Sequence, residues 1–184
     1  MEYTKQHILD DKLCRILLDK KGVLPTIGES TDSDYHVKRP TEEQFSACCN
    51  EFWWCSNNIA KGLWREEITY VQDMTNFVVR KQLEKMLEWK VGSMTDFSVS
   101  VGKSAKYINR WLEDDIYQSY LKTYFSADIE EAWKAILVMC DLFNKIAKEV
   151  ANDLNYNYSL SEAKMAKKYL LDVKSLPKDA KELY

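Results

Sequence analysis

Five residues recur along one stretch of the chain at the spacing of a helix face. They are Glu51, Trp54, Asn58, Lys61 and Arg65, within the sequence NEFWWCSNNIAKGLWREE. Side chains three and four positions apart lie on one side of an α-helix. Such a face could hold a cationic sugar or guanidinium group on the carboxylate and the indole, and phosphate oxygens on the two basic groups. An ordinary solvated face is the alternative, because mixed charges are common on exposed helix surfaces.

Three shorter motifs also carry chemical groups. The sequence DSD at 32–34 could bind Mg²⁺ beside a phosphate, but it sits among turn residues without a Gly-Ser turn before it, which favours a loop or cap. The sequence GKS at 102–104 has Phe97 where a P-loop needs its first glycine. The sequence EWK at 88–90 is either a second wall of a pocket or a helix end with a buried tryptophan.

The elements that must position these groups are helical from Pro40 onward. Thr41 and Gln44 form a predicted capping box, and apolar residues then repeat near every 3.5 positions through Leu63, with Gly62 as the expected stop. A long apolar stripe that starts after Asp128 predicts the inner face of a bundle helix. The expected helices cover about 41–62, 66–91 (ended by Gly92), 104–112, 114–124, 128–154 and 161–173.

The first 40 residues differ from the rest. The apolar run Leu13–Asp19, a turn at 20–22 and the pair Val23–Leu24 predict a short strand or hairpin. A lone hairpin is marginal in water, so it should belong to a sheet that the later sequence does not provide. We therefore predict an all-α bundle of about five helices at 41–184, preceded at 1–40 by a strand or hairpin segment.

Composition narrows the class of protein. The chain has 184 residues, a net charge of −3 and 46% hydrophobic residues, which is typical of one globular domain and argues against nucleic acid as a partner. No apolar run is long enough to span a membrane. Five cysteines without a CxxC pair predict small buried side chains in a reducing, cytoplasmic setting rather than a zinc site or other metal centre.

Three strings point to a known family. The sequences CCNEFWWCSNNIAKGLWREE, LEWKVG and FSVSVGKSAKYI resemble the C-terminal half of the aminoglycoside 6-adenylyltransferases, and TDSDYHVKRP resembles their interdomain linker. The resemblance covers nearly the whole chain. It implies transfer of AMP from ATP to the 6-hydroxyl of the aminoglycoside streptomycin, an antibiotic-resistance reaction that uses Mg²⁺ bound to carboxylates of a nucleotidyltransferase domain.

The motif for those carboxylates, a Gly-Ser turn followed by paired aspartates, does not occur in this sequence. The resemblance thus implies a truncated, substrate-binding part that is inactive alone, has no catalytic residue and no metal ligand, and binds neither Mg²⁺ nor ATP tightly. If the bundle forms half of a cleft, the chemistry and placement of the opening stretch point to Glu51, Trp54 and Asn58 for the aminoglycoside and to Lys61 and Arg65 for nucleotide phosphates. The alternative is a non-enzymatic helical module that docks on a separate nucleotidyltransferase domain or forms a homodimer.

Overall fold

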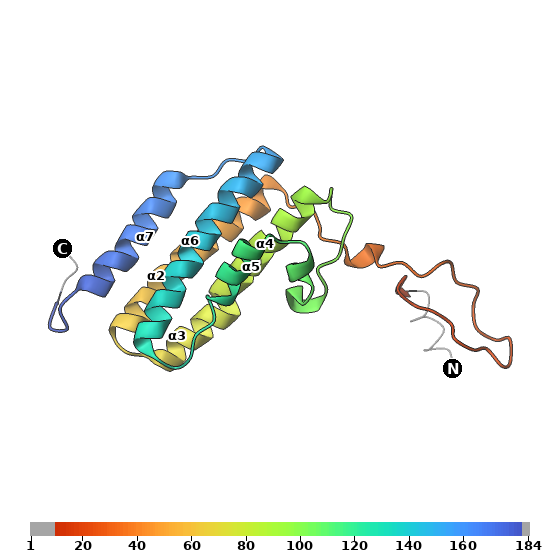
Figure 1. Cartoon of the computed structure of the whole chain (residues 1–184), viewed down its shortest axis with the longest axis horizontal. Helices are drawn as coiled ribbons and strands as arrows, with labels where there is room; N and C mark the ends of the chain where they lie inside the picture. The colour runs from red at the N-terminus through yellow and green to blue at the C-terminus, as the bar shows by residue number, and fades with distance from the viewer. Residues whose placement is uncertain (1–9, 182–184) are drawn as a thin grey trace.

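The computed structural model describes residues 10–181, and this part of the chain is a bundle of α-helices (Figure 1). A π-helical segment, η2 (Thr75–Val79), joins two of the α-helices, and three short 3-10 turns occur outside them. The α-helices within 10–181 are α2 (Glu42–Trp64), α3 (Ile68–Met74), α4 (Arg80–Met94), α5 (Asp114–Leu121), α6 (Ile129–Leu154) and α7 (Leu160–Ser175). The 3-10 turns are η1 (Ser33–Tyr35), η3 (Lys103–Ala105) and η4 (Ile108–Arg110).

The starts of α2 and α6 follow their predicted caps. The Gln44 amide donates to Thr41 Oγ1 at 3.3 Å while the Thr41 amide donates to Gln44 Oε1 at 3.0 Å, which completes the capping box. The Glu131 amide donates to the Asp128 carboxylate at 2.8 Å. These bonds satisfy backbone donors that have no partner inside the helix.

Gly62 does not end α2, as the sequence suggested, but lies buried inside it. A Cβ at this position would lie 2.8 Å from Cδ1 of Tyr70, so the missing side chain lets α3 pack closely against α2. The helix continues to Trp64. A glycine near a helix end can therefore mark a close contact rather than a stop.

The helix expected over 66–91 is divided, and the one expected over 104–112 is replaced. The first becomes α3, η2 and α4, and α4 passes through Gly92 to Met94. The second becomes η3 and η4, because Ser104 and Ala105 have φ of 56° and 55°, a left-handed conformation that no α-helix accommodates. These turns bend the segment over the end of the bundle.

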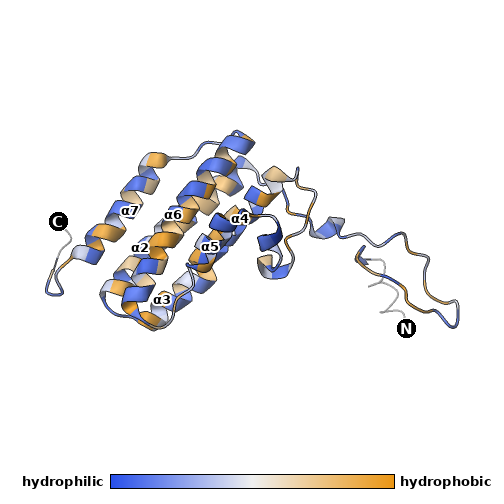
Figure 2. Ribbon diagram, viewed as in Figure 1, coloured by the Kyte–Doolittle hydropathy of each residue, from blue (hydrophilic) through white to orange (hydrophobic). Residues whose placement is uncertain are grey.

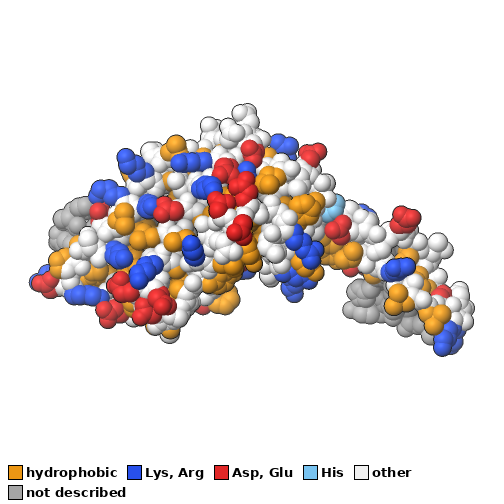
Figure 3. All heavy atoms as spheres, in the orientation of Figure 1, with side chains coloured by type: hydrophobic (Ala, Val, Ile, Leu, Met, Phe, Trp, Pro, Cys, Tyr) orange, Lys and Arg blue, Asp and Glu red, His pale blue; other side chains and the backbone are white. Residues whose placement is uncertain are grey.

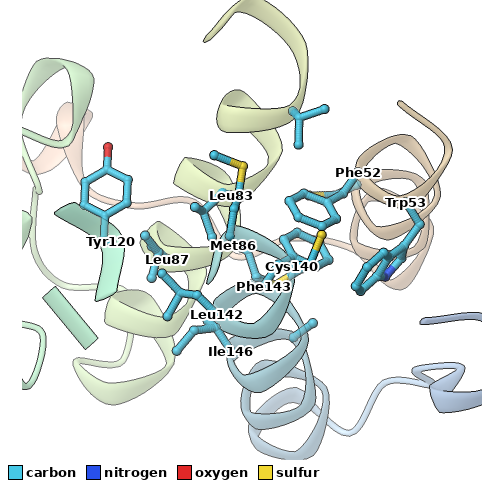
Figure 4. Packing of buried hydrophobic residues seen from close by; sticks show 14 of the residues in the cluster. Phe52, Trp53, Leu83, Met86, Leu87, Tyr120, Cys140, Leu142, Phe143 and Ile146 are labelled. Carbon is cyan, nitrogen blue, oxygen red and sulfur yellow. The ribbon is translucent and has the colours of Figure 1, made fainter. Parts of the chain in front are cut away.

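The core lies where α2, α4 and α6 meet. The rings of Phe52 and Phe143 stack with centroids 3.7 Å apart, and both side chains are fully buried (Figure 4). Apolar residues of α2, α4 and α6 form one buried cluster, and apolar and polar segments alternate along these helices (Figure 2). None of the helices described in 10–181 is long and apolar enough to cross a membrane.

The strand or hairpin predicted at 13–24 was wrong. Residues 10–32 form an extended arm that leaves the bundle, and no strand occurs anywhere in the described residues (Figure 1). Asp19 closes a turn by accepting bonds from the amides of Lys21 and Leu24, and one backbone bond of 3.0 Å joins Thr31 to Lys12. An apolar run becomes a strand only if a neighbouring strand pairs with it, and Leu17 is 89% exposed.

The cysteines of α2 and α6 are buried, as predicted from the number and spacing of cysteines in the sequence. Cys48, Cys49, Cys55 and Cys140 are all free thiols in the interior, whereas Cys14 is half-buried in the arm. Burial raises the pKa of the Cys48 thiol to about 12, because the charged thiolate is poorly solvated there. We infer that these core thiols are unreactive at neutral pH.

Candidate functional site

A groove of about 1500 Å³ opens between α2, α4, the linker at 32–39 and the bent segment at 98–111. We call it the α2–α4 groove. Its lining contains acidic, basic and aromatic side chains from four separate parts of the sequence. The lining residues are Leu13, Asp32, Tyr35, His36, Val37, Lys38, Arg39, Gln44, Ala47, Cys48, Glu51, Gln82, Lys85, Glu88, Trp89, Ser98, Val99, Ser100, Val101, Gly102, Lys103, Lys106, Tyr107, Arg110 and Trp111.

The outer wall of the groove is held in place by a tight turn after α4. The Phe97 amide donates to the carbonyl of Gly92 at 2.8 Å, and the Phe97 ring lies against the glycine, where a Cβ would be 2.4 Å from ring atom Cε1. The next residues pair with the linker, since the Val37 amide donates to the carbonyl of Val99 at 2.9 Å. The linker and the loop after α4 thus form one wall.

The floor of the groove comes from the contact between α2 and α4. Cys48 Sγ donates to the carbonyl of Gln82 at 3.4 Å, and the Trp89 ring packs against Phe45 with centroids 6.4 Å apart. The earlier residue on α2, Phe45, contacts the later residue on α4, Trp89, so the two helices are antiparallel. Of the two alternatives for the EWK motif, the structure favours the pocket wall, because Trp89 lines the groove with a ring that packs against Phe45.

Two carboxylates line the groove at separate points along this antiparallel pair. Glu51 lies one turn beyond Cys48 on α2, and Glu88 lies two turns beyond Gln82 on α4, in the opposite direction. Because the two helices are antiparallel, Glu51 and Glu88 lie at different positions along the groove. Two carboxylates that line one groove suit a ligand with more than one positive charge.

Glu88 occupies the less solvated of the two positions. Burial raises the pKa of its carboxyl group above the ordinary value of 4.5, and the negative charge of Glu84 adds to this rise, while Lys81 and Lys85 oppose it. The ionised form of Glu88 is therefore disfavoured in the empty groove. A bound cation would restore the charge balance and bring the pKa down.

The opposite wall of the groove is basic. Arg110 and Lys106 both lie over the ring of Tyr107, at 4.0 and 4.8 Å from its centroid, and Arg39 lies 5.8 Å from the Phe97 ring. Basic side chains gather around the bent segment that follows α4 (Figure 3). Lys103, Lys106 and Arg110 are spaced by three and four residues in the sequence, but the segment forms turns rather than an α-helix, so this spacing does not by itself place them on one face.

The structure separates the five residues that the sequence placed on one face. Glu51 lines the groove, whereas Trp54 is 69% exposed and lines a second hollow beside α7. Asn58 is half-buried, and Lys61 and Arg65 are exposed at the far end of α2, outside the lining of the groove. The structure therefore brings Glu51 together with Glu88 and Trp89. The ligand roles of all five residues, Glu51, Trp54, Asn58, Lys61 and Arg65, stay predictions.

The DSD and GKS motifs both lie in short turns. Asp34 pairs with Lys12 at 2.8 Å, and Asp32 lies 3.1 Å from His36, so the DSD motif stabilises the linker. The GKS motif forms the short turn η3 rather than the start of an α-helix. Within residues 10–181, no three His, Cys, Asp or Glu side chains gather into a group that could hold a metal ion.

Lys90, the third residue of the EWK motif, contributes to the bundle instead of the groove. Its ammonium group pairs with Glu149 at 3.0 Å and with Asp153 at 3.4 Å, both on α6. Ser93 donates to the same Asp153 carboxylate at 2.8 Å. These contacts fasten the end of α4 to α6 and so fix the position of the neighbouring groove residues.

Comparison with known proteins gives a consistent result. The family model described as streptomycin adenylyltransferase matches residues 1–173. Proteins named aminoglycoside 6-adenylyltransferase are similar to the chain: one from Campylobacter jejuni is 33% identical over 90% of this chain and 58% of its own length, and one from Bacillus subtilis is 36% identical over 81% and 52%. The Staphylococcus aureus protein of that name is 36% identical over 80% and 52%.

A solved structure agrees with these matches. A crystal structure of an aminoglycoside 6-adenyltransferase from Bacillus subtilis superposes with a TM-score of 0.70 and 30% sequence identity, and the match covers 95% of this chain and 64% of that one. The chain thus spans little more than half the length of the curated relatives that it matches.

Proposed function

The chain belongs to the streptomycin adenylyltransferase family, and we propose on that premise that its α2–α4 groove holds the aminoglycoside substrate. The observation that carries the proposal is the placement of Glu51 and Glu88 at two separate points of one groove. Streptomycin carries guanidinium groups, which stay charged at any physiological pH and bind carboxylates through paired hydrogen bonds. Each carboxylate would receive one cationic group of the drug.

Aromatic side chains in the same groove suit the rest of such a ligand. Trp89 is held by its contact with Phe45, and Trp111 and Tyr107 line the groove from the bent segment. Their faces can pack on sugar rings and attract the positive charges beside them. The groove therefore combines charge recognition with flat apolar surfaces, the combination that a polycationic sugar requires.

The basic wall suits the nucleotide of the family reaction. Lys103, Lys106, Arg110 and Arg39 face the same space as the carboxylates and would attract the phosphates of ATP, whose AMP is transferred in this family. Mg²⁺ requires several oxygen ligands, and the described residues provide no such group.

The two parts of the chain would then have different roles. Residues 41–184 would form the substrate-binding helical domain, since the groove floor lies on α2 and α4. Residues 1–40 would form the segment that connects this domain to the nucleotidyltransferase part found in longer family members. The pairing of Val37 with Val99 supports this division, because it places the connecting segment at the edge of the groove.

The pH dependence of streptomycin binding tests the proposal. Because Glu88 has a raised pKa, we expect affinity to fall as the pH drops through that raised value, at a pH still above 4.5, where an ordinary glutamate stays ionised. One carboxylate–guanidinium contact and one cation–π contact together contribute about 5 kcal/mol. This free energy corresponds to a Kd of about 0.2 mM. Titration calorimetry of the chain with streptomycin over a pH series gives the profile.

The Glu88→Gln variant is the matched control for this profile. It should bind more weakly at neutral pH and lose the part of the pH dependence that lies above 4.5. An unchanged profile in the variant would show that Glu88 does not face the drug. Absence of any streptomycin binding by the folded wild-type chain would overturn the proposed function.

A further inference from the structure

A second hollow of about 660 Å³ lies on the other side of α2, against α7 and the loop that precedes it. We call it the α2–α7 hollow. It shares no lining residue with the α2–α4 groove, and helix α2 separates the two. The residues that line the hollow are Phe45, Ser46, Cys49, Asn50, Trp53, Trp54, Asn57, Asn157, Tyr158, Ser159, Glu162, Met165, Ala166 and Tyr169.

We propose that the α2–α7 hollow is a binding site for a protonated amino sugar. Trp54 offers an indole that is 69% exposed at the edge of the hollow, and a pyranose ring can pack its C–H face on such a surface. Glu162 supplies a carboxylate for an ammonium group. Asn50 and Asn57 supply amides that can both donate to and accept from sugar hydroxyls.

One polar group in the hollow lacks a partner. Asn57 Oδ1 is buried and accepts no hydrogen bond from any described residue. Leaving a buried acceptor unpaired costs free energy, about 1–3 kcal/mol. A rotation of this amide toward a sugar hydroxyl would remove the cost, so the hollow contains a group that gains from ligand binding.

The walls around these groups are already fixed. Trp53 Nε1 donates to the hydroxyl of Tyr158 at 3.3 Å, and that hydroxyl donates to Asn144 Oδ1 at 3.1 Å. The Ser159 hydroxyl accepts from the Glu162 amide at 3.3 Å and caps α7 at the position of the carboxylate. A site that is ordered before binding loses little conformational entropy when the ligand arrives.

The chemistry of the hollow favours a sugar over a quaternary ammonium ion. A site for the latter encloses the cation between aromatic faces. Here Trp54 stands at an exposed edge, and amide and carboxylate groups occupy the space beside it. Choline, a quaternary ammonium ion, is therefore a suitable probe for this competing class of ligand.

The test uses D-glucosamine and its uncharged analogue N-acetylglucosamine, with the full chain observed by NMR. The chain has six tryptophans, and a Trp54→Phe variant assigns the indole signal of Trp54. We expect glucosamine to shift that signal, and N-acetylglucosamine to bind about tenfold more weakly because it cannot pair with Glu162. A Glu162→Gln variant should bind glucosamine about tenfold more weakly and N-acetylglucosamine as before.

The controls separate this site from the groove. Glu51→Gln should leave glucosamine binding at Trp54 unchanged. Trp54→Ala should remove the changes that glucosamine causes in the NMR signals of the Asn57 and Glu162 backbone amides. Kanamycin, an aminoglycoside built of amino sugars, tests whether the bound amino sugar can be a ring of a drug. It should shift the Trp54 signal in the Glu51→Gln variant as well. Equal binding of both glucosamines, or a response to choline alone, would overturn the proposal.

Discussion

A chain that carries Glu51→Gln together with Glu88→Gln is expected to bind streptomycin at least about 100-fold more weakly than the wild type. Each carboxylate would lose one charge-assisted contact, and such contacts contribute about 1.5–3 kcal/mol each. Glutamine keeps the shape of glutamate, and Glu88 pays a desolvation cost when ionised. The double variant should therefore fold at least as well as the wild type. Calorimetric titration and thermal unfolding measure the two effects.

A second double variant separates local recognition from net charge. Glu67→Gln with Glu130→Gln removes the same number of charges from exposed positions that do not line the groove. It should bind streptomycin within a factor of a few of the wild type, because charges beyond a Debye length are largely screened in physiological salt. Equal losses in the two double variants would mean that overall charge, not the groove, determines the affinity.

Phe52→Ala is expected to lower the free energy of unfolding by about 3–5 kcal/mol, a large part of the stability of a domain of this size. The side chain is fully buried, stacks on Phe143 at 3.7 Å and meets Trp53 edge-on at 5.0 Å. Its removal leaves a cavity between α2 and α6 that the rigid helices cannot close. Urea unfolding, followed by circular dichroism, measures the change.

Trp54→Ala is the matched control on the same helix. This indole is 69% exposed, so its removal should change the free energy of unfolding by no more than about 0.5 kcal/mol. The two variants together test which side of α2 faces the core. Comparable destabilisation by both would contradict the packing of α2 against α6.

Local signals in the sequence located the longest helices. The capping residues Thr41 and Asp128 and the apolar stripes behind them predicted α2 and α6 because caps and helix faces depend on residues a few positions apart. The same local rules failed at Gly62 and at 104–112. At Gly62 the deciding contact is with Tyr70 on the next helix, and at 104–112 two residues adopt left-handed φ.

The candidate site depends on contacts that a local pattern cannot reveal. Glu51 was identified from its spacing on one helix, but its companion Glu88 lies on a different helix, and only the antiparallel packing of α2 and α4 brings both into one groove. Trp54, three positions after Glu51, lines the hollow beside α7 instead of this groove. The hairpin at 13–24 failed for a related reason, since a strand requires a partner that the described chain does not supply.

A crystal structure of this chain with streptomycin would test the central claim most directly. We predict electron density for the drug in the α2–α4 groove, with cationic groups at Glu51 and Glu88 and a ring against Trp89. Density over the exposed face formed by Trp54, Asn58, Lys61 and Arg65, with an empty groove, would contradict the proposed site and favour the face that the sequence alone suggested.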